Sequence, residues 1–160
     1  MGLFYEYDDT DMVTMLHYVK KNWKRKVTAF DAAIIEDLFL KYDFDPNMVK
    51  WLLSYIYERG AVSLSYIYPI ADVLKKQGIN DSLSAEIFLN KEFDKYKRLL
   101  KKMNLFRSIP QKKEKEIIDS WYKKYSENEI LEACSVTAAK AKRPSVAYTD
   151  AVLKNRKEAE

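Results

Sequence analysis

Apolar and aromatic residues recur at helical spacing along most of the chain, and two stretches carry nearly the same pattern. In residues 34–42 and 117–125 these side chains fall at positions i, i+1, i+4, i+5 and i+8, which forms one broad stripe on a helix. The stretches 48–56 and 130–138 correspond in the same way. The offset between matching positions is 83 residues in the first pair and 82 in the second. The pattern therefore predicts one small helical module that is used twice.

Helix-start signals stand where this repeat requires them. Asp45 before Pro46 is typical of an N-cap followed by proline at the first helical position. Ser126 with Glu129 three residues later has the spacing of a capping box, and Thr28 begins a similar one. We expect helices at about these positions: 11–26, 29–42, 46–58, 63–76, 82–104, 111–124, 127–140 and 144–157.

These elements predict an all-α fold. Three glycines and four prolines in 160 residues leave little material for tight β-hairpins. We expect four parts: an N-terminal helical extension (1–27), a first helical unit (28–80), a connecting helix (81–107) and a second helical unit (108–160). Since each helix has a single apolar face, three short helices alone would be marginal. The two tandem units should therefore pack together through the connecting helix.

The composition restricts the class of protein. The chain is 48% hydrophobic, which is enough for a core. No run approaches the roughly 18 apolar residues of a membrane span, and the acidic N-terminus does not have the pattern of a secretory signal. Cys134 is the single cysteine and cannot form an internal disulfide, which is typical of a reducing compartment. We expect a cytoplasmic protein.

Candidate catalytic residues are sparse. His17 is the only histidine, so a transition-metal site has few ligands, and we expect His17 to be structural or at the surface. Cys134 falls on an apolar stripe and is expected in the core. Isolated glycines do not make a phosphate-binding loop. We therefore expect no enzyme activity, no cofactor and no metal.

The basic charge is concentrated in the second half of the chain. Residues 101–160 carry 14 Lys/Arg and 9 Asp/Glu, whereas residues 1–100 carry 14 Lys/Arg and 15 Asp/Glu. A basic surface of this kind attracts nucleic-acid phosphates. A solvated lysine-rich helix surface is the alternative interpretation for any one cluster.

Two tyrosines occupy matching positions in the repeat. Tyr66 and Tyr148 each precede, by one helical turn, an apolar residue on the same face, Ile70 and Val152 respectively. Each ring either packs between helices with its hydroxyl hydrogen-bonded or contributes to a binding surface.

Residues 108–154 resemble the DnaD-type helical domain of bacterial replication-initiation and primosome proteins. The similarity in the second unit is carried by Trp121, Glu129–Ala133, Tyr148, Val152 and Leu153. In the first unit it is carried by Tyr66, Ile67, Ile70 and the exit segment 75–79. Together the two copies cover about residues 28–157.

This resemblance implies a non-catalytic replication accessory protein. Its partners would be single- or double-stranded DNA, bound without sequence preference, and replication initiator or helicase-loader proteins, with a homo-oligomer also possible. Basic residues near Tyr148 assign DNA binding to the second unit: Lys140, Lys142, Arg143, Tyr148, Lys154, Arg156 and Lys157. Partner binding is assigned to the first: Tyr66, Ile70, Leu74, Lys75 and Lys76. The alternative function is a protein–protein adaptor, of phage or mobile-element replication, that does not bind DNA.

Overall fold

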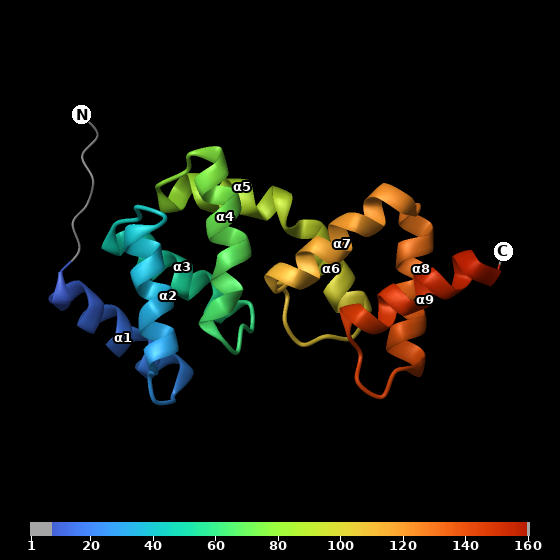
Figure 1. Cartoon of the computed structure of the whole chain (residues 1–160), viewed down its shortest axis with the longest axis horizontal. Coiled ribbons are helices and arrows are strands. Elements are labelled where there is room, and N and C mark those ends of the chain that lie inside the picture. The colour runs from blue at the N-terminus through green and yellow to red at the C-terminus, as the bar shows by residue number, and fades with distance from the viewer. Residues whose placement is uncertain (1–7, 160) are drawn as a thin grey trace. The chain divides into compact units, whose positions relative to one another are not determined.

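The chain folds into helices joined by short loops (Figure 1). The computed structural model describes the backbone of residues 8–159 and the side chains of residues 8–156, and this part contains no strand, so the predicted all-α class is confirmed. The elements are α1 (Asp9–Trp23), α2 (Ala29–Leu40), α3 (Pro46–Glu58), the 3-10 helix η1 (Leu64–Tyr66), α4 (Ile67–Gln77), α5 (Ser82–Glu92), α6 (Asp94–Lys102), α7 (Lys112–Lys124), α8 (Glu127–Lys140) and α9 (Val146–Ala159).

Contacts within the chain define two compact units, Met1–Lys91 (unit 1) and Glu92–Glu160 (unit 2). In unit 1, α1 packs against α2 and α3, and α3 packs against α4. The N-caps predicted at Thr28 and Asp45 are present, and each side chain accepts a hydrogen bond from a backbone N–H in the first turn. The core of unit 1 is made of fully buried aliphatic residues: Val19, Ile35, Leu38, Leu52, Leu53, Ile56, Ile67, Ile70 and Leu74.

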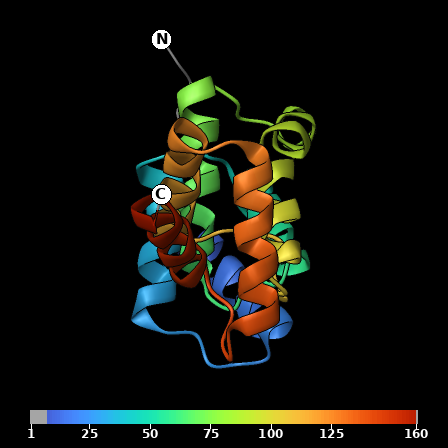
Figure 2. The same ribbon diagram turned by 90° about the vertical axis from the view of Figure 1, so that its right-hand side faces the viewer.

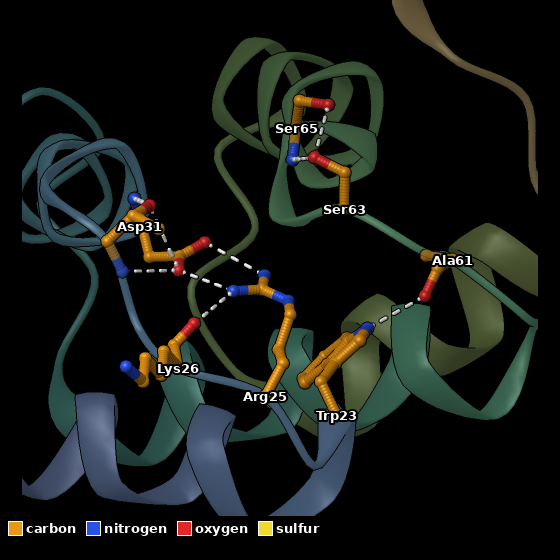
Figure 3. A network of polar contacts seen from close by, with 8 residues as sticks. Trp23, Arg25, Lys26, Asp31, Ala61, Ser63 and Ser65 are labelled. Atoms are coloured by element: carbon orange, nitrogen blue, oxygen red, sulfur yellow. Dashed lines mark hydrogen bonds and ion pairs between the residues drawn. The ribbon is translucent and has the colours of Figure 1, made fainter.

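Buried polar contacts hold the loops at one end of unit 1 (Figure 3). The Arg25 guanidinium donates to both carboxylate oxygens of Asp31, at 2.7 and 3.0 Å. Asp31 also accepts from the backbone N–H of Thr28, which closes the capping box of α2. The hydrogen bond from Arg25 holds the pKa of Asp31 below its ordinary value, although burial opposes this. The Trp23 indole N–H donates to the Ala61 carbonyl at 2.8 Å and so joins the C-terminal end of α1 to the loop after α3.

Two tyrosine–aspartate hydrogen bonds connect α2 and its C-terminal loop to α4. The Tyr42 hydroxyl donates to Asp72 at 2.5 Å, and the Tyr68 hydroxyl donates to Asp37 at 2.7 Å. Burial and these carboxylates raise the pKa of both tyrosines. Both hydroxyls therefore stay protonated and serve as donors.

Unit 2 is built around α8, which packs against α6 and α9, while α7 packs against α9. Its core includes Leu99, Leu100, Ile118, Trp121, Ile130, Ala133, Cys134 and Leu153. The buried hydroxyls of Thr137 and Thr149 lie 2.6 Å apart and join α8 to α9. The Trp121 indole N–H donates to Asp150 at 2.8 Å and joins α7 to α9.

The prediction of a single connecting helix at 82–104 was wrong. Helix α5 ends at Glu92, and α6 begins at Asp94 after a break at Phe93, whose φ and ψ are −97° and 0°. The Phe93 ring is buried and packs against Tyr96, with the ring centroids 5.1 Å apart. Since α6 then packs against α8, it belongs to the body of unit 2. Burial of the Phe93 ring therefore accompanies a change of chain direction at this residue.

Two residues of the predicted apolar stripes lie at the edge of the core. Ile34, Leu38, Leu52 and Trp121 are buried as predicted, but Ile117 and Leu131 are only partly buried. Their neighbours Ile118 and Ile130 occupy the core instead. The buried part of each stripe is therefore narrower than predicted and includes Ile118 and Trp121 on α7 and Ile130 and Cys134 on α8.

The two units share features beyond the predicted repeat. Helix α1 packs against α3 as α6 packs against α8. The Arg25–Asp31 ion pair has a counterpart in Arg107–Glu114, at 2.5 Å, and in both cases the acidic residue belongs to a capping box. The two units thus have these features in common, while a duplicated module stays a prediction. Superposition of the two units stays a prediction.

Candidate nucleic-acid interface

The loop between α8 and α9 carries three exposed cations. Lys140 ends α8, and Lys142 and Arg143 follow in the loop. Ala141 leaves the helix with extended φ and ψ, and Pro144 disfavours a helical conformation of the preceding Arg143. Among the described residues none of the three cations makes an ion pair, so their charge is directed to solvent. We call Lys140, Lys142 and Arg143 the α8–α9 basic loop.

The helices on either side hold this loop in place. Helices α8 and α9 lie side by side (Figure 2), and the Thr137–Thr149 hydroxyl contact is fully buried between them. The Ser145 hydroxyl accepts the backbone N–H of Tyr148 at 3.0 Å and starts α9. The three cations are therefore displayed by a supported turn.

The two tyrosines predicted at matching positions have different surroundings. The Tyr148 ring is 37% exposed on the first turn of α9, next to the α8–α9 basic loop. Tyr66 is 4% exposed and lies in the core of unit 1. Tyr148 is thus the one of the pair that a ligand could reach.

The other basic residues assigned to DNA binding are engaged locally. Lys154 pairs with Asp150 at 2.8 Å, and Arg156 pairs with Glu132 at 2.8 Å. Although burial raises the pKa of Asp150, the hydrogen bonds from Lys154 and Trp121 bring it below the ordinary value. Lys157 lies in α9, but its side chain falls outside the described residues. These positions contribute less free positive charge than the α8–α9 basic loop.

Residues assigned to partner binding in unit 1 are mostly inaccessible. Tyr66, Ile70 and Leu74 are buried in the core, so their side chains do not form a surface, contrary to expectation. Lys76 is exposed, and Lys75 lies 3.5 Å from the Asp43 carboxylate. A partner surface at the end of α4 would therefore consist of the two lysines.

Unit 1 carries a basic cluster that the sequence analysis missed. Lys20, Lys21, Lys24 and Lys26 are all exposed at the C-terminal end of α1. The signal was present in the run KKNWKRK at 20–26, but it was hidden because the first hundred residues are nearly neutral on average. Unit 1 therefore also has a basic surface that attracts phosphate.

Pockets lie between helices in the described part of the chain. One of about 140 Å³ lies between α7 and α9 and is lined by Trp121, Asp150 and Lys154 among others. Cys134 is buried, as predicted, and burial raises the pKa of its thiol to about 12, so it is a poor nucleophile. His17 is exposed on α1. Within the described residues, no three His, Cys, Asp or Glu side chains cluster as metal ligands would.

Comparison with known proteins gives one family. Residues 16–86 match the model of the DnaB_2 family, which is described as replication initiation and membrane attachment. The match falls within unit 1 and supports the DnaD-like resemblance there, while the resemblance of unit 2 stays a prediction. No curated protein and no solved structure matches the chain. Among the residues that the structure describes, no helix is long and apolar enough to cross a bilayer.

Proposed function

We propose that this chain is a non-catalytic accessory protein of DNA replication, which binds DNA without sequence preference through the α8–α9 basic loop. The observation that carries the proposal is a supported turn with three exposed cations that have no acidic partner among the described residues. Such cations bind phosphates and release counterions, a process that does not depend on base sequence. The family match of residues 16–86 provides the replication context.

The same observations favour different binding roles for the two units. The α8–α9 basic loop of unit 2 contacts DNA, and unit 1, which carries the family match, contacts an initiator or a helicase loader in the cytoplasm. The lysine cluster at the end of α1 provides a second, weaker attraction for phosphate. Of the partly exposed aromatic rings in unit 2, Tyr148 is the one placed to pack against a sugar or an unpaired base.

Charge reversal tests the DNA-binding part. The variant Lys140→Glu/Lys142→Glu/Arg143→Glu should lose binding to a labelled mixed-sequence oligonucleotide, measured by fluorescence anisotropy near 50 mM salt. Because all three side chains are exposed, the circular dichroism spectrum should not change.

A matched control distinguishes the effect of charge in the α8–α9 basic loop from the effect of the net charge of the chain. Reversal of three lysines in unit 1, Lys20, Lys21 and Lys26, changes the net charge by the same amount and should weaken binding less. Equal loss in both variants would mean that only net charge matters. Undiminished binding by the α8–α9 variant would move the interface elsewhere, and absence of binding by the wild type would favour the adaptor function.

A further inference from the structure

Phe106 is the most exposed large apolar residue in the described part of the chain. It lies in the loop between α6 and α7, and its relative exposure is 108%, whereas the next phenylalanine, Phe30, is 59% exposed. Single exposed apolar residues are common on protein surfaces. A ring with no neighbour at all leaves its whole apolar area in water. The residues around Phe106 therefore indicate whether this ring takes part in binding.

The residues around Phe106 hold the loop in one conformation. The backbone N–H of Leu105 donates to the Leu100 carbonyl at 3.0 Å, and Asn104 has a left-handed φ of 65°. The Arg107 guanidinium donates to the Ile109 carbonyl at 2.9 Å and pairs with Glu114. The chain is thus anchored on both sides of Phe106, and the ring is held out into solvent.

Basic residues flank Phe106 along the chain. Residues 95–113 contain eight Lys/Arg and no Asp/Glu, of which Lys95, Arg98 and Arg107 pair with acidic residues outside this range. Lys101 and Lys102 at the end of α6 and Lys113 at the start of α7 are exposed. The loop that carries Phe106 also lies on the same side of unit 2 as the α8–α9 basic loop (Figure 1). An aromatic face among cations is the arrangement with which proteins bind single-stranded nucleic acid.

We propose that Phe106 stacks on an unpaired base and gives this protein a preference for single-stranded over double-stranded DNA. This inference rests on the proposed function, because the flanking lysines must first hold the phosphates. Bases in a duplex are already stacked on one another, so the ring has no base face to contact there. Phe106 therefore adds affinity only for single strands.

A membrane surface fits these observations less well. Phe106 is the only fully exposed apolar residue of its loop. Leu105 is partly buried, and Ile109 is buried. One ring inserted into lipid buries little apolar area, so the flanking lysines would have to supply most of the attachment to anionic lipids. Stacking on a base, by contrast, requires a single aromatic ring.

Three substitutions at position 106 test the proposal in the full chain. Phe106→Ala should reduce affinity for an oligo(dT) of about 16 nucleotides roughly tenfold or more at constant salt. It should leave affinity for a duplex of mixed sequence unchanged. Phe106→Leu should lose as much as the alanine variant, because it keeps the apolar bulk but has no π face. Phe106→Trp should retain the affinity for the single strand.

The salt dependence and a control variant complete the test. Since stacking releases no counterions, the slope of log affinity against log salt should be the same for Phe106→Ala and the wild type. Phe30→Ala, which removes an exposed phenylalanine in unit 1, should have no effect on either DNA.

Several results would overturn the proposal. Equal loss for single-stranded and duplex DNA would show a general contact, and wild-type affinity in Phe106→Leu would show that apolar bulk suffices. An effect confined to vesicles of equal parts phosphatidylserine and phosphatidylcholine would assign the ring to a membrane. If the wild type binds neither oligonucleotide, the proposed function itself falls and this inference falls with it.

Discussion

Removal of the Trp121 ring should destabilise unit 2 and leave unit 1 folded. The ring is 1% exposed and packs in the core between α7 and α9, and its indole N–H donates to Asp150. Truncation of a buried aromatic residue to alanine costs about 3–5 kcal/mol of unfolding free energy. The adjacent pocket of about 140 Å³ gives water access to part of the space left behind. We therefore expect the lower end, about 3 kcal/mol.

The hydrogen bond accounts for a smaller part of this cost. Trp121→Phe removes the hydrogen-bond donor to Asp150. The Asp150 carboxylate still pairs with Lys154 at 2.8 Å, and the Asp150 side chain is 21% exposed. Because Asp150 is rehydrated easily, this variant should lose only about 1 kcal/mol.

Hydrogen exchange and urea unfolding measure the effect. Because the chain has two compact units, unfolding is not expected to be a single two-state transition. Amide protection in Trp121→Ala should therefore fall in α7 and α9 and persist in α2 and α3. Trp51→Ala is the control, since that ring is only partly buried on α3 of unit 1, and it should cost less and affect unit 1 alone. A Trp121→Ala variant no less stable than Trp51→Ala would refute the assigned packing.

Two further predictions concern titratable groups. The pKa of Asp31 is lower in the folded state, so its ion pair with Arg25 stabilises unit 1 above pH about 4 and this stabilisation is lost as pH falls through the folded pKa. Asp31→Asn should therefore lower the stability of unit 1 at neutral pH, and the variant should lose less stability than the wild type on acidification. The measurement is the urea midpoint at neutral and at acidic pH. If the difference between the two midpoints is the same in the variant and the wild type, the prediction is wrong. The Cys134 thiol, with a pKa of about 12, should react slowly with an aromatic disulfide reagent in the folded protein and rapidly in urea. Immediate reaction of the folded protein would place that thiol outside the core.

Local signals in the sequence predicted the helices well. Capping residues such as Thr28, Asp45 and Ser126 act within one turn, so their patterns could be recognised without knowledge of the fold. The break at Phe93 could not be recognised in this way, because it accompanies burial of that ring against Tyr96. Which edge of the predicted apolar stripe on α7 is buried likewise depends on which helix lies opposite.

The candidate site was predicted only in part. The exposed loop at Lys142 and Arg143 follows from charge and a proline, both visible in the sequence. The Lys154–Asp150 pair has the i, i+4 spacing and could have been foreseen. The Arg156–Glu132 pair joins residues far apart in sequence and requires the packing of α8 on α9. Phe106 falls within the expected connecting helix (81–107), and the sequence assigns it no role, because exposure of an apolar residue is a property of the folded chain.

The salt dependence of DNA binding tests the central proposal most directly. The affinity of the wild-type chain for a single-stranded oligonucleotide should be measured by anisotropy from about 50 to 200 mM salt. Three phosphate contacts from the α8–α9 basic loop predict that log affinity falls linearly with log salt, with a slope of about −2 or steeper. A chain that binds no DNA near 50 mM salt, or whose affinity does not change with salt, would contradict the account.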